Sequence, residues 1–116
     1  MKKGDIFLVN FEPSIGSEFK KTRPAIVLQS SEINSKLLTV MPISTNKNEE
    51  KLGENILIKR KKENRLFADS VIKVNQISSF DKRRFIHFIG RADRVIMNKI
   101  DKYLSRHFSL LLRDKG

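Results

Sequence analysis

The side chains of this chain that could do chemistry are a guanidinium, two hydroxyls, a carboxylate and an amide, set among many cations. They are Glu18, Arg23, Ser44, Thr45 and Gln76. A guanidinium and a hydroxyl can donate hydrogen bonds to phosphoryl oxygens, where negative charge grows as a phosphodiester is cleaved. In RNA the ribose 2′-hydroxyl is itself a nucleophile, so a protein needs only to align it with the bond that breaks. RNA cleavage is therefore one hypothesis for these residue types.

Other kinds of catalytic site find little support. The chain has no cysteine, which excludes a thiolate zinc site. Its two histidines, His87 and His107, lie far apart and outside any metal-ligand spacing, so zinc catalysis is excluded. The presence of two histidines does not by itself exclude a Ser–His–Asp hydrolase, but the Gly-x-Ser-x-Gly motif of such a nucleophile is absent. No phosphate-binding glycine loop of a nucleotide-dependent enzyme is present either. We expect neither a metal nor an organic cofactor.

Positive charge dominates the composition. Twenty-four Lys and Arg against 13 Asp and Glu give a formal net charge of +11. A domain this basic usually meets a polyanion, although the charge could also serve solubility alone. Clustering of the cations favours a polyanion. The clusters are Lys20, Lys21 and Arg23; Lys59 to Arg65, with five cations and one carboxylate; and Lys82 to Arg84.

Short strands must position these groups. Apolar runs rich in β-branched and aromatic residues predict strands over 5–11, 25–29, 37–43, 55–59, 70–74 and 85–89. Arg23-Pro24 opens the second of these strands, since Pro24 suits a first strand position. After Asp93, a good N-cap, apolar residues recur at helical spacing and predict an amphipathic helix of about five turns. The apolar stripe consists of Ile96, Ile100, Leu104, Phe108 and Leu111/Leu112.

These elements predict a mainly β fold with a C-terminal α-helix. Short antiparallel strands must protect their edges, so about six of them are expected to curl into a small, partly open barrel. The length of 116 residues predicts a single domain over 1–116. The N-terminus lacks the apolar region of a signal peptide, and no apolar run approaches the roughly 20 residues of a membrane span. We expect a cytoplasmic protein with no membrane partner.

A series of motifs follows the whole chain in order. Near the N-terminus come Gly4-Asp5-Ile6, Glu12-Pro13, Gly16-Ser17-Glu18 and Arg23-Pro24 followed by an apolar run. Val40 to Thr45, Asp69-Ser70-Val71, Gln76, Phe80 to Arg84 and Gly90 come later. In this order and spacing the motifs resemble the MazF/PemK toxins of type II toxin–antitoxin systems.

The resemblance implies a fold, an activity and partners. The fold is of the Kid/CcdB type, an SH3-like barrel with helices that works as a homodimer. The activity is metal-independent, sequence-specific cleavage of single-stranded RNA, which leaves a 2′,3′-cyclic phosphate and a 5′-hydroxyl. The partner is a cognate antitoxin whose acidic, largely disordered tail folds across the toxin.

The resemblance also carries over site residues. Arg23 matches the family's catalytic Arg, Ser44 its catalytic Thr, and Glu18 the Glu of Gly-Ser-Glu. We expect Arg23 to bind the transition-state phosphate, since an unperturbed guanidinium is a poor proton donor. Ser44 would donate to a phosphoryl oxygen, and Glu18 would position Arg23 or the 2′-hydroxyl. The residues expected to bind RNA are Ser17, Phe19, Lys20, Lys21, Thr45, Asn46, Lys61, Lys62 and Gln76.

The chain departs from the family pattern at several positions. Phe19 stands where Gln is common, and Ser44 replaces Thr, which loses the methyl that stiffens χ1. The PemK-like branch has a His in the first loop and an Arg-x-Asp before the Gln, where this chain has Ser17, Lys73 and Asn75. The Arg/Thr branch is therefore the better match.

Two alternative functions stay open. A non-catalytic nucleic-acid-binding barrel would keep the basic loops without needing Arg23 or Ser44. A gyrase-poisoning toxin of the same fold would act through the end of its C-terminal helix, where such toxins carry a Trp. This chain has no Trp.

Overall fold

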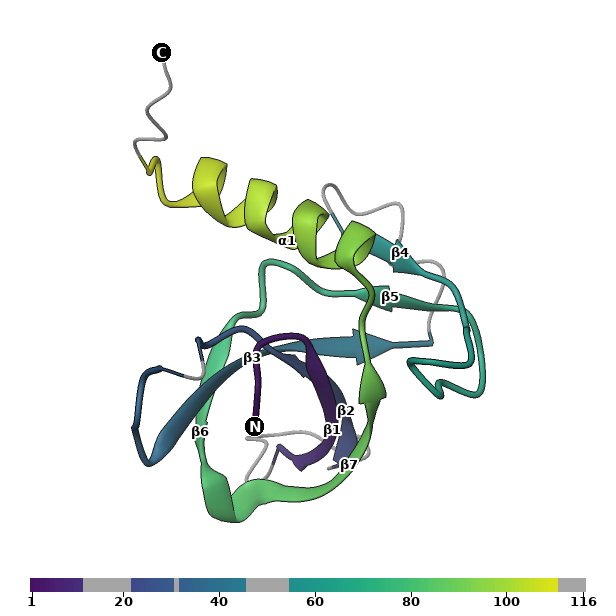
Figure 1. The fold of residues 1–116 in the computed structure, drawn as a ribbon, viewed down its shortest axis with the longest axis horizontal. Helices are drawn as coiled ribbons and strands as arrows, with labels where there is room; N and C mark the ends of the chain where they lie inside the picture. Colours follow the sequence, from purple (N-terminus) through teal and green to yellow (C-terminus); the bar gives the residue numbers. More distant parts are fainter. Residues whose placement is uncertain (12–21, 31, 46–54, 111–116) are drawn as a thin grey trace, which may run out of the picture.

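A curled antiparallel sheet with one helix lying across it makes up the computed structural model of the chain (Figure 1). The structure describes residues 1–11, 22–30, 32–45 and 55–110. The strands are β1 (Asp5–Asn10), β2 (Thr22–Val27), β3 (Leu37–Ser44), β4 (Ile56–Ile58), β5 (Ser70–Ile72), β6 (Ser78–Asp81) and β7 (Phe85–Arg91). A 3-10 turn, η2 (Lys82–Arg84), precedes β7, and the helix is α1 (Arg94–His107).

The strand β3 organises the sheet. The strand order is β4-β5-β3-β2-β1-β7, and β6 pairs with β3 off this path. Along one edge β3 has two partners in succession: residues 37–40 pair with β6, and Ile43 and Ser44 pair with β5. Along its other edge β3 pairs with β2. The turn between β5 and β6 is held against β3 by the bond from the Lys73 N–H to the Pro42 carbonyl, 2.9 Å long.

Alternation along the strands fills two separate cores. Ile26 belongs to the larger core, which also receives Ile96, Ile100 and Tyr103 of α1. Its neighbours on β2, Ala25 and Val27, face the smaller core. The smaller core consists of Val9, Ala25, Val27 and Val40, with Phe7, Phe11, Phe80 and Phe85 packed against it.

The segment joining β4 to β5, residues 59–69, is called here the basic hairpin. Its Asn64 side chain is buried, accepts hydrogen bonds from the N–H groups of Lys61 and Leu66, and donates one to the Lys59 carbonyl. The tip packs on β7, where the Arg91 N–H donates to the Glu63 carbonyl. A Cβ at Gly90 would lie 2.5 Å from the Asn64 carbonyl oxygen, so only glycine permits this approach.

The predicted fold class is confirmed: the chain is mainly antiparallel β with one C-terminal helix. The described residues form seven strands, and the strand missed is β6, whose sequence Ser-Ser-Phe-Asp has little apolar pattern. The strand predicted to open at Arg23-Pro24 begins one residue earlier, at Thr22, because its ladder to β1 extends to the Asn10–Thr22 pair, and it ends at Val27.

The prediction for the helix was partly wrong. α1 ends at His107 after 14 residues, about four turns, and Phe108 is its 56% exposed C-cap. Tyr103 is buried in the core instead, and Leu111 and Leu112 lie outside the described residues. Asp93 is the N-cap as predicted, since its side chain accepts from the Ile96 N–H. Among the described residues, no helix has the length and apolarity of a membrane span.

Candidate active site

Arg23 and Ser44 lie on neighbouring strands at the same end of the β2–β3 ladder. The ladder pairs Val27 with Val40 and Ala25 with Pro42. Arg23 and Ser44 come two residues beyond that last pair, one on each strand. Side chains two residues apart share a face of a sheet, so both project on the face of the smaller core. Both side chains are partly buried.

Arg23 is held by an aromatic pair. Its guanidinium carbon lies 5.9 Å from the ring centroid of Phe11, and Phe11 meets Phe80 edge-on at 4.9 Å. Arg84 stands over the other member of the pair, 5.8 Å from the Phe80 centroid, and donates to the Asn10 carbonyl. Two guanidinium groups thus flank one aromatic pair at this end of the smaller core.

Other predicted site residues border the pair. Thr45 follows Ser44 and is exposed. On the edge of β3 that faces away from β2, Ser44 pairs with the buried Val71 of β5. Gln76 is exposed on the turn that leaves β5, where its N–H donates to the Lys73 carbonyl. The turn places Gln76 three residues from the Lys73–Pro42 bond, near the end of β3.

Six predicted site residues lie outside the described part of the chain. They are Ser17, Glu18, Phe19, Lys20, Lys21 and Asn46. Their roles stay predictions.

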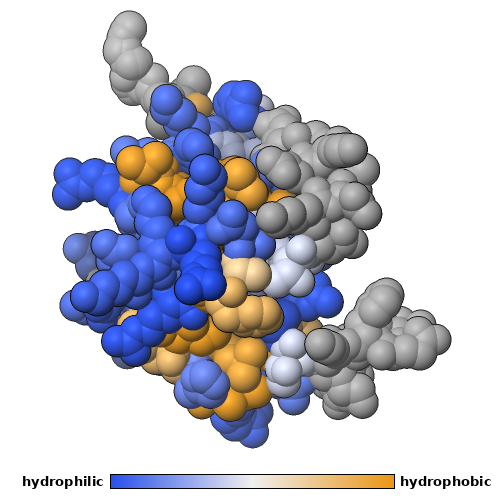
Figure 2. Space-filling model, turned by 90° about the vertical axis from the view of Figure 1, so that its right-hand side faces the viewer, coloured by the Kyte–Doolittle hydropathy of each residue, from blue (hydrophilic) through white to orange (hydrophobic). Residues whose placement is uncertain are grey.

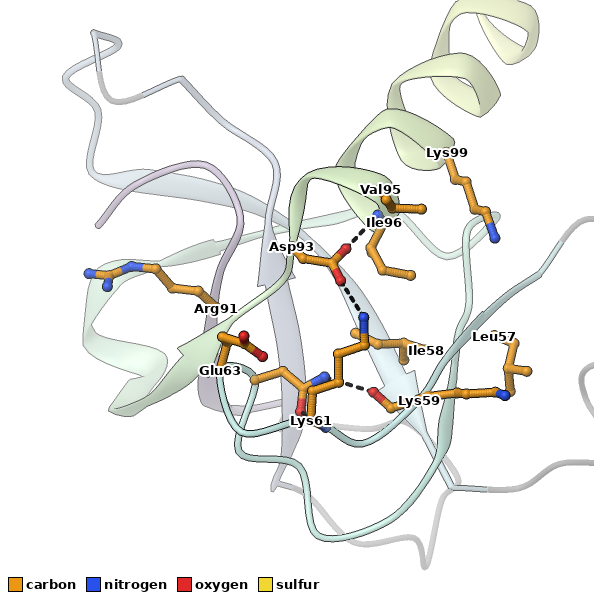
Figure 3. Close-up of a pocket in the computed structure, with 11 residues that line it drawn as sticks. Leu57, Ile58, Lys59, Lys61, Glu63, Arg91, Asp93, Val95, Ile96 and Lys99 are labelled. Carbon is orange, nitrogen blue, oxygen red and sulfur yellow. Dashed lines mark hydrogen bonds and ion pairs between the residues drawn. The ribbon is translucent and has the colours of Figure 1, made fainter.

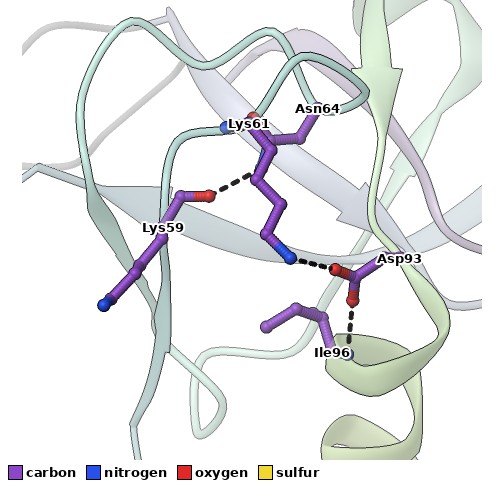
Figure 4. A network of polar contacts seen from close by, with 5 residues as sticks. All are labelled: Lys59, Lys61, Asn64, Asp93 and Ile96. Atoms are coloured by element: carbon purple, nitrogen blue, oxygen red, sulfur yellow. Dashed lines mark hydrogen bonds and ion pairs between the residues drawn. The ribbon is translucent and has the colours of Figure 1, made fainter.

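On the basic hairpin, Lys61 and Lys62 have different surroundings. The Lys61 ammonium lies 2.8 Å from the Asp93 carboxylate at the start of α1 (Figures 3 and 4). This hydrogen bond raises the pKa of Lys61 and lowers the pKa of Asp93, whose carboxylate also accepts from the Ile96 N–H. Lys62 is exposed one residue further on. Lys61 thus ties the hairpin to α1 in this structure, and Lys62 faces solvent.

A cavity of about 250 Å³ lies between β4, the basic hairpin and the first turn of α1 (Figure 3). Lys59, Lys61 and Lys99 line it together with Asp93. It is separate from the Arg23–Ser44 pair, and its central polar groups, Lys61 and Asp93, already bond to each other.

The two histidines make contacts within the protein. His87 is exposed on β7 and its Nδ1 lies 3.2 Å from the Phe88 carbonyl. His107 meets the Tyr103 hydroxyl at 3.0 Å and stacks on its ring. Within the described ranges, no cluster of three or more His, Asp or Glu is placed to hold a metal ion.

The arrangement offers a fixed cation and a hydroxyl on one face. A guanidinium and a hydroxyl at half-buried positions are partly shielded from bulk water, which strengthens hydrogen bonds to an anionic ligand. A guanidinium and a hydroxyl are donor types that phosphodiester oxygens accept hydrogen bonds from.

Sequence reasoning did not assign Phe11 and Arg84 to this site. Phe11 directly follows β1 and continues the alternation of Phe7 and Val9, and β1 is the neighbour of β2, so strand period could have indicated its place beside Arg23. No sequence signal brings Arg84 there, since its contact with Asn10 joins residues 74 positions apart.

Comparisons with known proteins give a consistent result. A family model described as the PemK-like, MazF-like toxin of type II toxin–antitoxin systems matches residues 2–108. The endoribonuclease EndoA of Bacillus subtilis (strain 168) is 31% identical over 113 residues, which are 96% of this chain and 97% of EndoA.

Solved structures match the fold. The crystal structure of MazF from Deinococcus radiodurans aligns with a TM-score of 0.76 at 18% identity, over 95% of this chain and 97% of that one. The Mycobacterium tuberculosis toxin MazF-mt6 aligns with a TM-score of 0.72 at 18% identity, over 91% and 97%.

Proposed function

Since this chain belongs to the PemK-like, MazF-like toxin family of type II toxin–antitoxin systems, we propose that it cleaves single-stranded RNA at the Arg23–Ser44 pair. Its 31% identical relative is named an endoribonuclease, and the shared length is nearly complete. The toxin endoribonuclease class follows from this kinship. The residues, the products and the independence from metal are our proposal.

The observation that carries the proposal is the position of Arg23 and Ser44 at the end of one ladder and on one face. Each residue type suits a phosphodiester, and their accessibility admits one. A placement on opposite faces, or burial of Arg23, would have removed the proposal.

In the proposed reaction the 2′-oxygen forms a bond to phosphorus while the P–O5′ bond breaks. The 2′-hydroxyl gives its proton to water, and the leaving 5′-oxygen takes one from water to become a hydroxyl. Arg23 and Ser44 donate hydrogen bonds to the phosphoryl oxygens, where charge accumulates. Glu18 is the proposed positioning group for Arg23 or the 2′-hydroxyl. No metal or organic cofactor takes part in these steps.

The proposed protein partner is an antitoxin with an acidic segment. Its attraction to a chain of net charge +11 would speed association. Association rates that fall steeply with added salt would support this, and salt-independent rates would contradict it.

We also propose a homodimer. Leu37, Leu104 and Phe108 line an apolar groove together with Ile33, and three of these four side chains are at least half exposed. A second copy of the chain would cover this surface, and sedimentation equilibrium tests it. A monomer across micromolar concentrations would contradict the dimer.

The test of the function is to map cleavage ends on a long RNA in the presence of EDTA. We expect discrete sites with 2′,3′-cyclic phosphate and 5′-hydroxyl ends. RNA that is bound but left intact would support the non-catalytic barrel instead. Relaxed or cleaved DNA with gyrase would support the gyrase alternative.

Arg23→Ala tests the residue assignment. We expect the single-turnover rate to fall about 10²–10³-fold, the usual cost of losing one donor to a developing oxyanion. Arg94→Ala, which removes an exposed guanidinium from the first turn of α1, is the matched control and should cleave like wild type. Wild-type activity in a folded Arg23→Ala protein would end the assignment.

A further inference from the structure

Phe67 on the basic hairpin is the most exposed large apolar side chain among the described residues, at 83%. Its neighbour Leu66 turns inward and is 7% exposed. The Arg60 guanidinium donates to the Phe67 carbonyl, and the Arg60 N–H donates to the Asp69 carboxylate at 2.8 Å. These two hydrogen bonds hold the backbone that carries Phe67, whose ring faces solvent.

The hairpin that carries Phe67 is braced at several points. Asn64 makes three hydrogen bonds to the hairpin backbone, and Lys61 is paired with Asp93 on α1. Arg65 adopts a left-handed backbone with φ of 54°, which turns the chain from Asn64 toward Leu66. A braced aromatic loses little conformational freedom when a ligand binds it.

Several cationic residues lie close to Phe67 in the sequence. Arg60, Lys62 and Arg65 are all exposed, and Glu63 is the one carboxylate between them. The face that includes the hairpin, on the right of Figure 1, shows broad hydrophilic areas separating smaller apolar ones in Figure 2. An aromatic ring among cations suits an unpaired nucleotide, because the base stacks on the ring and the cations bind phosphates. A protein partner that binds by apolar contact would need a broader apolar patch than one ring.

The hairpin leads directly to the proposed site. Val71 pairs with Ser44, and Phe67 precedes Val71 by four residues. Four residues span at most about 14 Å, so the ring lies within reach of an RNA strand bound at Ser44.

We propose that Phe67, with Arg60, Lys62 and Arg65, forms a stacking subsite for an unpaired base of the RNA, outside the bond that is cleaved. The subsite rests on the proposed function and adds affinity without touching the reacting atoms. It therefore affects KM and leaves kcat unchanged. RNA too short to extend from Ser44 to Phe67 gains nothing from it.

The test uses RNA that cannot be cleaved, so that binding is separated from catalysis. The probes are fluorescent 2′-O-methyl oligoribonucleotides of about 16 and about 4 nucleotides, the range of single-strand site sizes. Affinity is measured by fluorescence anisotropy for wild type, Phe67→Ala and Phe67→Tyr. Val95→Ala, which truncates a 61% exposed apolar residue on α1, is the control.

We expect Phe67→Ala to weaken binding of the longer probe about 5- to 100-fold, as loss of one stacked base does. Phe67→Tyr and Val95→Ala should bind it within about two-fold of wild type, because tyrosine keeps the aromatic face. The shorter probe should not distinguish Phe67→Ala from wild type.

Equal affinity of Phe67→Ala and wild type for the longer probe would overturn the subsite and leave the nuclease proposal standing. Failure of the wild-type protein to bind either probe would overturn both proposals. An effect of Phe67→Ala on antitoxin binding alone would also overturn the subsite, since it would assign the ring to the protein partner.

Discussion

Arg23 is a long side chain, and the ring of Phe11 fixes where its guanidinium stands. Phe11 is itself fixed edge-on by Phe80. Such cation–π and aromatic contacts are each worth about 0.5–1.5 kcal/mol, enough to favour one rotamer over another. At the residue scale, the proposed reaction depends on this support as well as on the charge.

Phe11→Leu should therefore lower kcat with little change in KM. We expect a decrease of about 2- to 10-fold, corresponding to the loss of one such contact. Phe11→Tyr keeps the ring face and should restore kcat, whereas Phe11→Leu stays apolar but lacks that face. Single-turnover and steady-state kinetics on one RNA separate the two constants. Equal kcat for Phe11→Leu and wild type would contradict a positioning role.

Residue types alone indicated part of this site. Arg23 and Ser44 could be proposed from the sequence because their motifs resemble those of the MazF/PemK toxins. The support by Phe11, Phe80 and Arg84 could not, because it depends on β1, β6 and η2 meeting in space. Phe67 could be seen as an aromatic among cations, but its exposure could not, since Leu66 beside it is buried.

At the scale of elements, the Lys61–Asp93 contact joins the basic hairpin to α1 (Figure 4). Asp93 also caps the helix, so one carboxylate serves both elements. Helix N-caps are worth about 1 kcal/mol, and asparagine caps nearly as well as aspartate. Asp93→Asn thus removes the charge and retains the cap.

The contribution of the Asp93 charge to the stability of the folded protein should decrease as the pH falls. The hydrogen bond from Lys61 lowers the pKa of Asp93 in the folded protein below its ordinary value of 3.8. The stabilisation is therefore fully present above that value and is lost as the pH falls through the lower, folded pKa. Wild type should have a higher midpoint of urea unfolding than Asp93→Asn at neutral pH, and the difference should vanish in stronger acid.

Glu32→Gln, which removes an exposed carboxylate distant from Asp93 in the sequence, is the control for net charge. A wild-type advantage that persists unchanged in acid would show that the carboxylate charge is not its source.

Elements whose apolar residues recur with a strand or helix period could be predicted from the sequence. Elements that form only because a neighbouring element pairs with them could not. The strands around Ile6, Ile26 and Val40 follow from apolar runs. β6 has no such run and is a strand because β3 offers it an edge. Tyr103 enters the core because it follows Ile96 and Ile100 at helical spacing on one face of α1.

At the scale of the whole molecule, the net charge of +11 governs the encounter with RNA. Binding should weaken with salt at a logarithmic slope of about −0.7 for each phosphate neutralised on a single strand. For about four phosphates, a four-fold rise in salt should lower affinity about 50-fold.

Titration of the 2′-O-methyl probe at several salt concentrations measures this slope. Lys62→Ala should make the slope about 0.7 less steep if Lys62 binds a phosphate, whereas Lys99→Ala, on α1, should leave it unchanged. An affinity that is indifferent to salt would contradict phosphate contacts altogether.

The pairing of β1 with β7 ties the beginning of the chain to a strand near its end. Asp5 faces Arg91 in the ladder and forms an ion pair with it, 3.0 Å long, across 86 positions of sequence. During synthesis on the ribosome, one edge of β1 stays unpaired until β7 has been made. The basic hairpin likewise cannot pack against Gly90 until that residue has been added. Contacts between such distant segments form slowly. The sheet is therefore complete only after β7 has been synthesised.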